Sequence, residues 1–251
     1  MSADTVHPEY AQVESDFASP ATAQALASLN TDERDQLHEY WVARADGELT
    51  TALSFEYVLE DLRKLNAPGE FTSLAERAIA DEHRHVDWCL RWARAVDAER
   101  DASAKFGGTR PLTFSGASER DHLLLRTVFG CCFSETVAVH VLRASHALIQ
   151  LDSVKRLNHR HLSEEMGHAR LGWALVAWPA LGQRERDMLR AHVPEMLSLT
   201  REAWTSSQRA ATDRLHQLGY LSTPLVKAAC DEAIEQVVLP GLAHVGILPR
   251  G

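Results

Sequence analysis

This 251-residue sequence has only four cysteines, and their spacing excludes several kinds of site. Cys89, Cys131, Cys132 and Cys230 form no C-x-x-C pair and none of the spacings of a zinc ribbon. Cys131 and Cys132 are adjacent within an apolar stretch, which is typical of small packing residues. We therefore expect a reduced protein without a disulfide framework.

Targeting and membrane features are also lacking. The first residues, Met-Ser-Ala-Asp-Thr-Val-His, contain neither the basic nor the apolar region of a signal peptide. We find no run of about 18 apolar residues that would cross a membrane. The sequence therefore predicts a cytoplasmic protein without a membrane partner.

Basic residues are fewer than acidic ones. The chain has 26 Lys and Arg against 35 Asp and Glu, a net charge of −9, so it lacks the overall positive charge of a nucleic-acid-binding protein. Nucleic acid is thus an unlikely partner. A composition of 45% hydrophobic and 24% charged residues is typical of a globular protein and excludes a disordered chain.

No stretch alternates β-branched and polar residues as a strand would, whereas helical periodicity recurs throughout. We predict an all-α fold: a four-helix bundle with two additional C-terminal helices. Residues 1–29 are read as an N-terminal arm or short irregular helix, and residues 30–251 as one domain whose four-helix core spans about 30–178. The expected helices are 30–65, 73–102, 118–150, 152–178, 183–217 with a bend at Pro194, and 223–239, with a loop at 105–111.

One stripe of side chains stands out on the fourth expected helix. His161, Glu165 and His168 fall within about 60° of arc on a helix of 3.6 residues per turn. An isolated Glu-x-x-His is most often part of a solvated helix face. A carboxylate-bridged two-metal site needs a second Glu-x-x-His helix and two helices that each provide one Glu.

The sequence contains that repeat. Glu48 lies 34 residues before the Glu of Glu82-x-x-His85, and Glu135 lies 30 residues before Glu165 of the second motif. Glu135 is flanked by apolar residues, where an unpaired carboxylate would be costly. The repetition favours a metal site with the ligands Glu48, Glu82, His85, Glu135, His161, Glu165 and His168.

Neighbouring charges are candidates for orienting these ligands. Asp81 and Glu164 each precede a ligand Glu, and either can hold a histidine through its second ring nitrogen. Arg84 can pair with one of these acids. Small residues expected on the metal-facing side, which would leave room for oxygen and substrate, are Ala52, Cys131 or Cys132, and Gly167.

The segment Asp81-Glu-His-Arg-His85 matches an Asp/Glu-Glu-x-Arg-His motif, and with the other ligands it resembles the ferritin-like di-iron carboxylate superfamily. That group includes bacterial multicomponent monooxygenase hydroxylases, acyl-carrier-protein desaturases and rubrerythrins. The second motif departs from the pattern, because Gly167 stands where Arg is usual. The additional His161 is similar to the p-aminobenzoate N-oxygenase family of arylamine oxygenases. The resemblance covers roughly residues 40–175.

By this resemblance the chain is expected to be a di-iron oxygenase, an oxidoreductase that uses O₂ to N-oxygenate or hydroxylate a small organic substrate, with arylamines favoured. It implies two Fe ions as cofactors, with Mn or a mixed Fe/Mn pair as alternatives. The expected partners are an external electron donor and, as an option, a second copy of the chain in a homodimer. The alternatives are an iron oxidation and storage protein and a ferritin-like tRNA hydroxylase. Storage has no need of His161, and the acidic charge disfavours RNA.

Overall fold

The computed structural model describes residues 8–105, 110–206 and 210–249, in which all regular elements are helical. The expected all-α fold is confirmed. The elements are α1 (Pro8–Phe17), α2 (Pro20–Ala27), α3 (Thr31–Lys64), α4 (Gly69–Val96), α5 (Glu119–Val128), the π-helical η1 (Phe129–Ser134), α6 (Glu135–Leu148), α7 (Asp152–Val176), α8 (Gln183–Thr205), α9 (Asp213–Gln217), α10 (Thr223–Ala233), the π-helical η2 (Ile234–Val238) and α11 (Leu239–His244).

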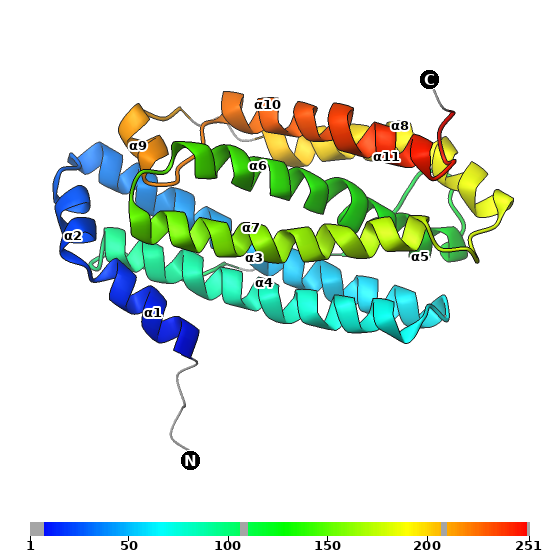
Figure 1. The fold of residues 1–251 in the computed structure, drawn as a ribbon, viewed down its shortest axis with the longest axis horizontal. Coiled ribbons are helices and arrows are strands. Elements are labelled where there is room, and N and C mark those ends of the chain that lie inside the picture. The colour runs from blue at the N-terminus through cyan, green and yellow to red at the C-terminus, as the bar shows by residue number, and fades with distance from the viewer. Residues whose placement is uncertain (1–7, 106–109, 207–209, 250–251) are drawn as a thin grey trace, which may run out of the picture.

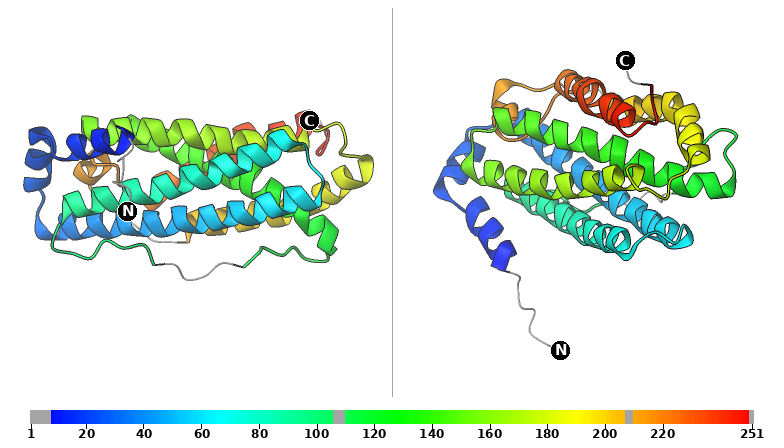
Figure 2. Two further views of the ribbon diagram at one scale, coloured as in Figure 1. Left: turned by 90° about the horizontal axis from the view of Figure 1, so that it is seen from below. Right: turned by 45° about the vertical axis from the view of Figure 1, so that its right-hand side comes forward.

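Two long helical hairpins form the body of the molecule. The α3–α4 hairpin packs against the hairpin of α6 and α7, and α8, α10 and α11 cover the outer side of α6 (Figure 1). The views of Figure 2 show that α3, α4 and α7 run side by side along the length of the bundle. The tandem arrangement expected from the repeated Glu spacing is thus present.

The N-terminal segment, expected to form an arm or a short irregular helix, is helical in its described part. Two helices, α1 and α2, pack at one end of the bundle against α4 and α7 (Figure 1). Val13, Phe17 and Leu26 are buried there, and the ring of Phe17 lies 4.7 Å from that of Trp92. Val13 and Phe17 are four residues apart on α1, but the Ser-, Ala- and Thr-rich residues around the three anchors leave the periodicity of the segment weak.

The α3 helix begins and ends at recognisable capping signals. The sequence Asn30-Thr-Asp-Glu33 resembles a capping box, and the structure confirms it. Asn30 accepts a hydrogen bond from the Glu33 amide while the Glu33 carboxylate accepts one from the Asn30 amide. At the other end Asn66 takes a left-handed conformation (φ 52°), and the Ala67 amide donates to the Leu62 carbonyl. This Schellman arrangement turns the chain sharply into α4.

Several helix boundaries were wrong in the sequence reading. The second helix begins at Gly69 rather than Ser73, because burial of Phe71 draws the preceding turn into the helix, and it ends at Val96 rather than Ala102. The helix expected over 183–217 stops at Thr205, and a short α9 follows at Asp213–Gln217. The expected loop at 105–111 includes residues 106–109, which lie outside the described residues.

The third core helix contains a π-helical turn that its sequence does not predict. The stretch expected as one helix over 118–150 passes from α5 through the π-helical η1 into α6. Ser118 caps its start as expected, accepting a hydrogen bond from the Asp121 amide. A π-helical turn widens the helix and changes the direction of the side chains that follow, the first of which is Glu135.

This third helix is also the most apolar part of the chain. Residues Glu119–Leu148 are long and apolar enough by length and composition to cross a membrane, with a mean hydropathy of 1.3 in an 18-residue window. The helix passes this test although Arg126, Glu135 and His140 lie within it, so it is not an uninterrupted run of apolar residues. In the structure 67% of that window is buried inside the protein, where α7 and α10 pack against it.

A polar layer separates the two larger apolar cores of the interior, and a third, small cluster lies where α6 meets α10 and η2. One core gathers around Phe55, Leu62, Phe133, Leu171 and Leu175, and the other around residues nearer the α1 end, including Leu37, Trp41, Trp88, Trp92 and Leu157. On α4 and α7 the chain passes from one core to the other through a short segment of buried acids and histidines, and the corresponding part of α3 contains Glu48, which is partly exposed. That segment contains the candidate site.

Close contact between α7 and η1 depends on Gly172. A Cβ atom added there would lie 2.6 Å from the Cys132 amide nitrogen and 2.7 Å from the Cys131 carbonyl carbon, so neither backbone leaves room for it. We expect Gly172→Ala to lower the free energy of unfolding by about 1–3 kcal/mol, as overpacking does. Chemical denaturation measures this. Gly167→Ala is the matched control, because that helical position has open space and alanine there is expected to stabilise slightly.

Candidate metal centre

Four helices bring together all seven expected ligand side chains. Glu48 comes from α3, Glu82 and His85 from α4, Glu135 from the first turn of α6, and the remaining three from α7. The carboxylates and imidazoles form two groups that share Glu165, and within each group the nearest ligand atoms all lie within 4.8 Å of one another. Six of the seven residues are buried, and the Glu48 side chain is 14% exposed.

Glu82 and Glu165 each reach both histidines of the paired motifs. Glu82 places Oε2 3.2 Å from His85 Nδ1 and Oε1 3.1 Å from His168 Nδ1. Glu165 places Oε1 3.4 Å from His85 Nδ1 and Oε2 2.9 Å from His168 Nδ1. Both carboxylates therefore lie where they can bridge two metal ions, one oxygen to each.

The other two glutamates lie at opposite ends of this arrangement. Glu135 Oε2 is 3.9 Å from His168 Nδ1, on the side of the second group. Glu48 belongs with His85 and His161 in the first group, and its Oε1 lies 3.7 Å from His161 Nε2. Each group thus has one end carboxylate, but the first contains two imidazoles, from His85 and His161, and the second contains one, from His168.

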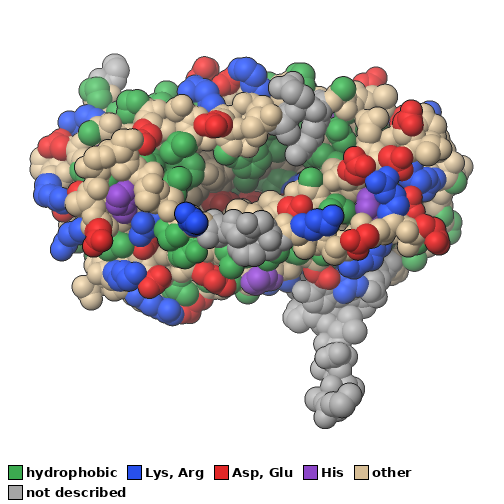
Figure 3. Space-filling model, turned by 180° about the vertical axis from the view of Figure 1, so that it is seen from behind, with side chains coloured by type: hydrophobic (Ala, Val, Ile, Leu, Met, Phe, Trp, Pro, Cys, Tyr) green, Lys and Arg blue, Asp and Glu red, His purple; other side chains and the backbone are tan. Residues whose placement is uncertain are grey.

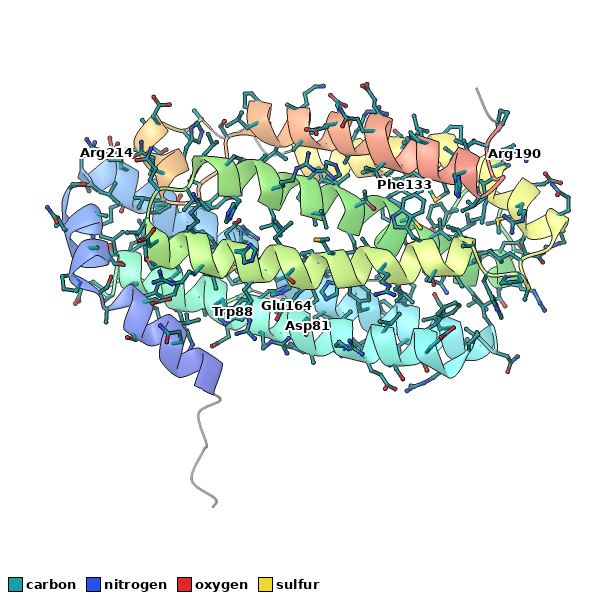
Figure 4. All side chains as sticks on the ribbon, viewed as in Figure 1. Asp81, Trp88, Phe133, Glu164, Arg190 and Arg214 are labelled. Carbon is teal, nitrogen blue, oxygen red and sulfur yellow. The ribbon has the colours of Figure 1, made fainter. Side chains whose placement is uncertain are left out.

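The two acids expected beside the histidines contact them across the helix pair. His85 Nε2 lies 2.9 Å from Glu164 Oε2, and His168 Nε2 lies 3.2 Å from Asp81 Oδ2. Arg84 donates to Asp81 and, at 3.3 Å, to Glu164, so one guanidinium ties both acids together. Figure 4 shows Asp81 and Glu164 close together between α4 and α7. These contacts aim Nδ1 of each histidine into the cluster.

The pKa shifts in the cluster favour bound protons, whose positive charge offsets the charge of the buried carboxylates. Burial, with repulsion from Glu165, raises the pKa of both Glu82 and Glu135. Burial opposes protonation of His85, but hydrogen bonds to Glu164 and Glu82 raise its pKa to about 10. The pKa of His168 is raised in the same way, against burial, by Glu165 and Asp81. Metal binding would displace these protons.

The donor set fits divalent metal ions. Glu82 Oε1 is buried and lacks a hydrogen-bond partner of good geometry, although His168 Nδ1 is only 3.1 Å away. An oxygen in that position is costly unless a cation contacts it. Four carboxylates with imidazoles form a mixed oxygen and nitrogen set that suits Fe, Mn and Zn alike. The cluster can therefore hold metal.

A cavity of about 580 Å³ reaches the first group from the protein surface. Glu48, His161 and Glu165 lie at its inner end, and Tyr40, Trp204, Val141 and Leu142 are among its walls. Figure 3 shows a hollow on this face of the molecule, with hydrophobic and acidic side chains inside it. Glu48 and His161 belong to the first group and Glu165 to both, so the cavity gives a small molecule a path to the first group.

The small residues that make this space are not the expected ones. Ala43, Gly47 and Ala138 line the cavity, whereas Cys131 and Cys132 are fully buried in the apolar core and Gly167 faces open space on another side of α7. Ser134, the last residue of η1, lines the cavity beside Ala138 of α6.

Sequence reasoning also missed Arg44. Its Nη2 donates to Glu48 Oε1 at 3.0 Å and lies 3.3 Å from His161 Nδ1, and its guanidinium lies 5.1 Å from the centre of the Trp41 ring. The spacing of four residues between Arg44 and Glu48 on one helix is the signal that predicts such a pair.

Comparisons with models of protein families, with curated proteins and with solved structures found no match to this chain, so the case for its function rests on the site itself.

Proposed function

We propose that the chain is a non-haem di-iron oxygenase of the ferritin-like type, which uses O₂ to N-oxygenate or hydroxylate a small organic substrate. The observation that carries the proposal is the combination of two overlapping carboxylate and imidazole groups with a cavity that opens onto one of them. A storage protein needs only an entry path for iron, whereas an oxygenase also needs space for an organic molecule beside the metals.

The cavity walls favour an aromatic substrate. Tyr40 and Trp204 are aromatic members of the lining, Val141 and Leu142 are aliphatic ones, and a volume of about 580 Å³ is in the usual range for small-molecule sites. Arylamines are the preferred class by resemblance. In the reaction one oxygen atom enters the substrate and the other leaves as water, which consumes two electrons and two protons from an external donor.

The metal pair, when bound, supplies the reduction of O₂, and the chain supplies the surroundings. Glu82 and Glu165 would hold both ions, while Asp81 and Glu164 fix the histidine rings. The apolar cores on both sides exclude water from the cluster except through the cavity. Glu48 and His161 lie where a substrate in the cavity would meet the site.

The test is oxygen-isotope incorporation by Fe(II)-loaded protein. With ¹⁸O₂, a chemical reductant and a substituted aniline, we expect the mass of the product to show one ¹⁸O atom per N- or C-oxygenation and several turnovers per chain. The Glu165→Ala variant is the matched negative control. Iron deposition beyond two ions per chain without labelled product would favour storage, and label found only when tRNA is added would favour RNA hydroxylation.

A further inference from the structure

The three histidines of the cluster differ in what contacts their outer ring nitrogen. For His85 and His168 this partner is a carboxylate, at 2.9 Å from Glu164 and at 3.2 Å from Asp81. A carboxylate accepts, so these rings carry their proton on Nε2 and leave Nδ1 for a metal ion.

His161 has the opposite kind of partner. Its Nδ1 lies 3.3 Å from Nη2 of Arg44, and an arginine side chain only donates hydrogen bonds. Nη2 of Arg44 carries a second hydrogen, which it donates to Glu48 Oε1 at 3.0 Å. Both hydrogens of Nη2 are therefore used, one by each acceptor, and Nδ1 of His161 must be the acceptor.

The inner nitrogen of His161 is then the protonated one. His161 Nε2 lies 2.8 Å from Glu165 Oε1, a good distance for donation to a carboxylate. Binding a metal through Nε2 would require the ring proton to move to Nδ1, where it would face the hydrogens of Arg44, or the loss of that single proton to leave an imidazolate. Either alternative is costly in a site this deeply buried.

Packing keeps this arrangement in place. The Arg44 guanidinium lies over the Trp41 ring, with 5.1 Å between its carbon and the ring centre. The His161 ring stacks on that of His85, with 3.7 Å between ring centroids. Neither the arginine nor the imidazole is free to turn without breaking one of these contacts.

We propose that Arg44 is a positioning residue that holds His161 in the Nε2–H form, so that His161 donates to Glu165 and is not a metal ligand. The protein then offers each metal ion one imidazole, from His85 or His168. The half of the cluster that faces the cavity has one protein ligand fewer than the sequence predicted. This inference rests on the metal-binding part of the proposed function and not on the reaction with O₂.

The experiment uses the full chain labelled with ¹⁵N in its histidine rings, both metal-free and loaded with Zn(II). Long-range ¹H–¹⁵N spectra distinguish a protonated ring nitrogen, an unprotonated acceptor and a metal-bound nitrogen, and the His161→Gln variant identifies the signals of His161. We expect His161 to show a protonated Nε2 and an acceptor Nδ1 in both states. A metal-bound Nε2 with a protonated Nδ1 in the loaded wild type would overturn the proposal.

Arg44→Met removes the donor while keeping an apolar stem over Trp41. In this variant we expect the proton of His161 to move to Nδ1 and Nε2 to bind Zn(II), which would add a third histidine ligand. Arg143→Met is the matched control, since Arg143 pairs with Glu232 on the exposed surface, and it should leave the spectrum unchanged. An unchanged His161 tautomer in Arg44→Met would show that Arg44 does not set it.

The outcomes separate this inference from the proposed function. If the chain takes up no Zn(II), the metal site is wrong, while the metal-free spectrum still reports which nitrogen of His161 carries the proton. If Zn(II) binds and His161 ligates it, the assignment of Arg44 fails and the di-iron proposal stands. Should Arg44→Met not fold, the wild-type spectra alone decide the tautomer.

Discussion

Replacing Glu165 by alanine is expected to abolish binding of both metal ions, because its two oxygens face His85 on one side and His168 on the other. Glu165 is also the member that both ligand groups share. Anaerobic titration with Fe(II), followed by metal analysis of the desalted protein, measures the number of ions per chain. We expect the count to fall from two in the wild type to fewer than one.

Variants of the two carboxylates that belong to one ligand group each provide the comparison. Glu48→Ala and Glu135→Ala each remove a carboxylate from one group only, so each should retain one tightly bound ion. Glu76→Ala alters a carboxylate that is 54% exposed and pairs with Arg63, and it should bind metal as the wild type does. If Glu165→Ala still bound two ions, the bridging assignment would be wrong.

The second large effect is expected at Asp61. This residue of α3 accepts two hydrogen bonds from Arg126 of α5, Nε to Oδ2 at 2.6 Å and Nη2 to Oδ1 at 2.7 Å. Its side chain is 3% exposed and that of Arg126 is 16% exposed. Asp61→Ala leaves a buried guanidinium without its partner, and we expect a loss of about 3–5 kcal/mol in the free energy of unfolding.

Urea unfolding of the metal-free protein tests this value. The double variant Asp61→Ala with Arg126→Met removes both charges, and much of the loss should be recovered because an apolar pair needs no counter-ion. The exposed pair of Arg63 and Glu76 gives the contrast, and Glu76→Ala is expected to change stability little. Equal losses at the two pairs would mean that burial does not decide the strength of the Asp61 contact.

The ligand set could be predicted because its signals are local and repeated. Helical spacing places Glu82 with His85, and Glu165 with His168, on one face each, and the flanking apolar residues indicate that these faces are buried. The start of α3 could also be predicted, because the capping box of Asn30 and Glu33 is contained in four residues. The roles of these side chains as metal ligands stay predictions.

Features that depend on tertiary packing could not be predicted. The contacts of Arg44 with His161 join residues 117 positions apart, and no local pattern indicates whether a histidine nitrogen will meet a donor or an acceptor. The π-helical turn before Glu135 and the early start of α4 likewise depend on packing between helices. The cavity is lined by residues from several helices, including α8 and α10, which lie outside the repeated hairpins.

The polar layer between the two apolar cores has a consequence for the whole molecule. Hydrophobic burial holds each end of the bundle together, but the middle is held by charges that repel one another wherever protons or cations do not intervene. An ion that binds only the folded state stabilises it by mass action. Bound metal would then raise the free energy of unfolding, so that the cofactor would also stabilise the contact between the helices in the layer that separates the two cores.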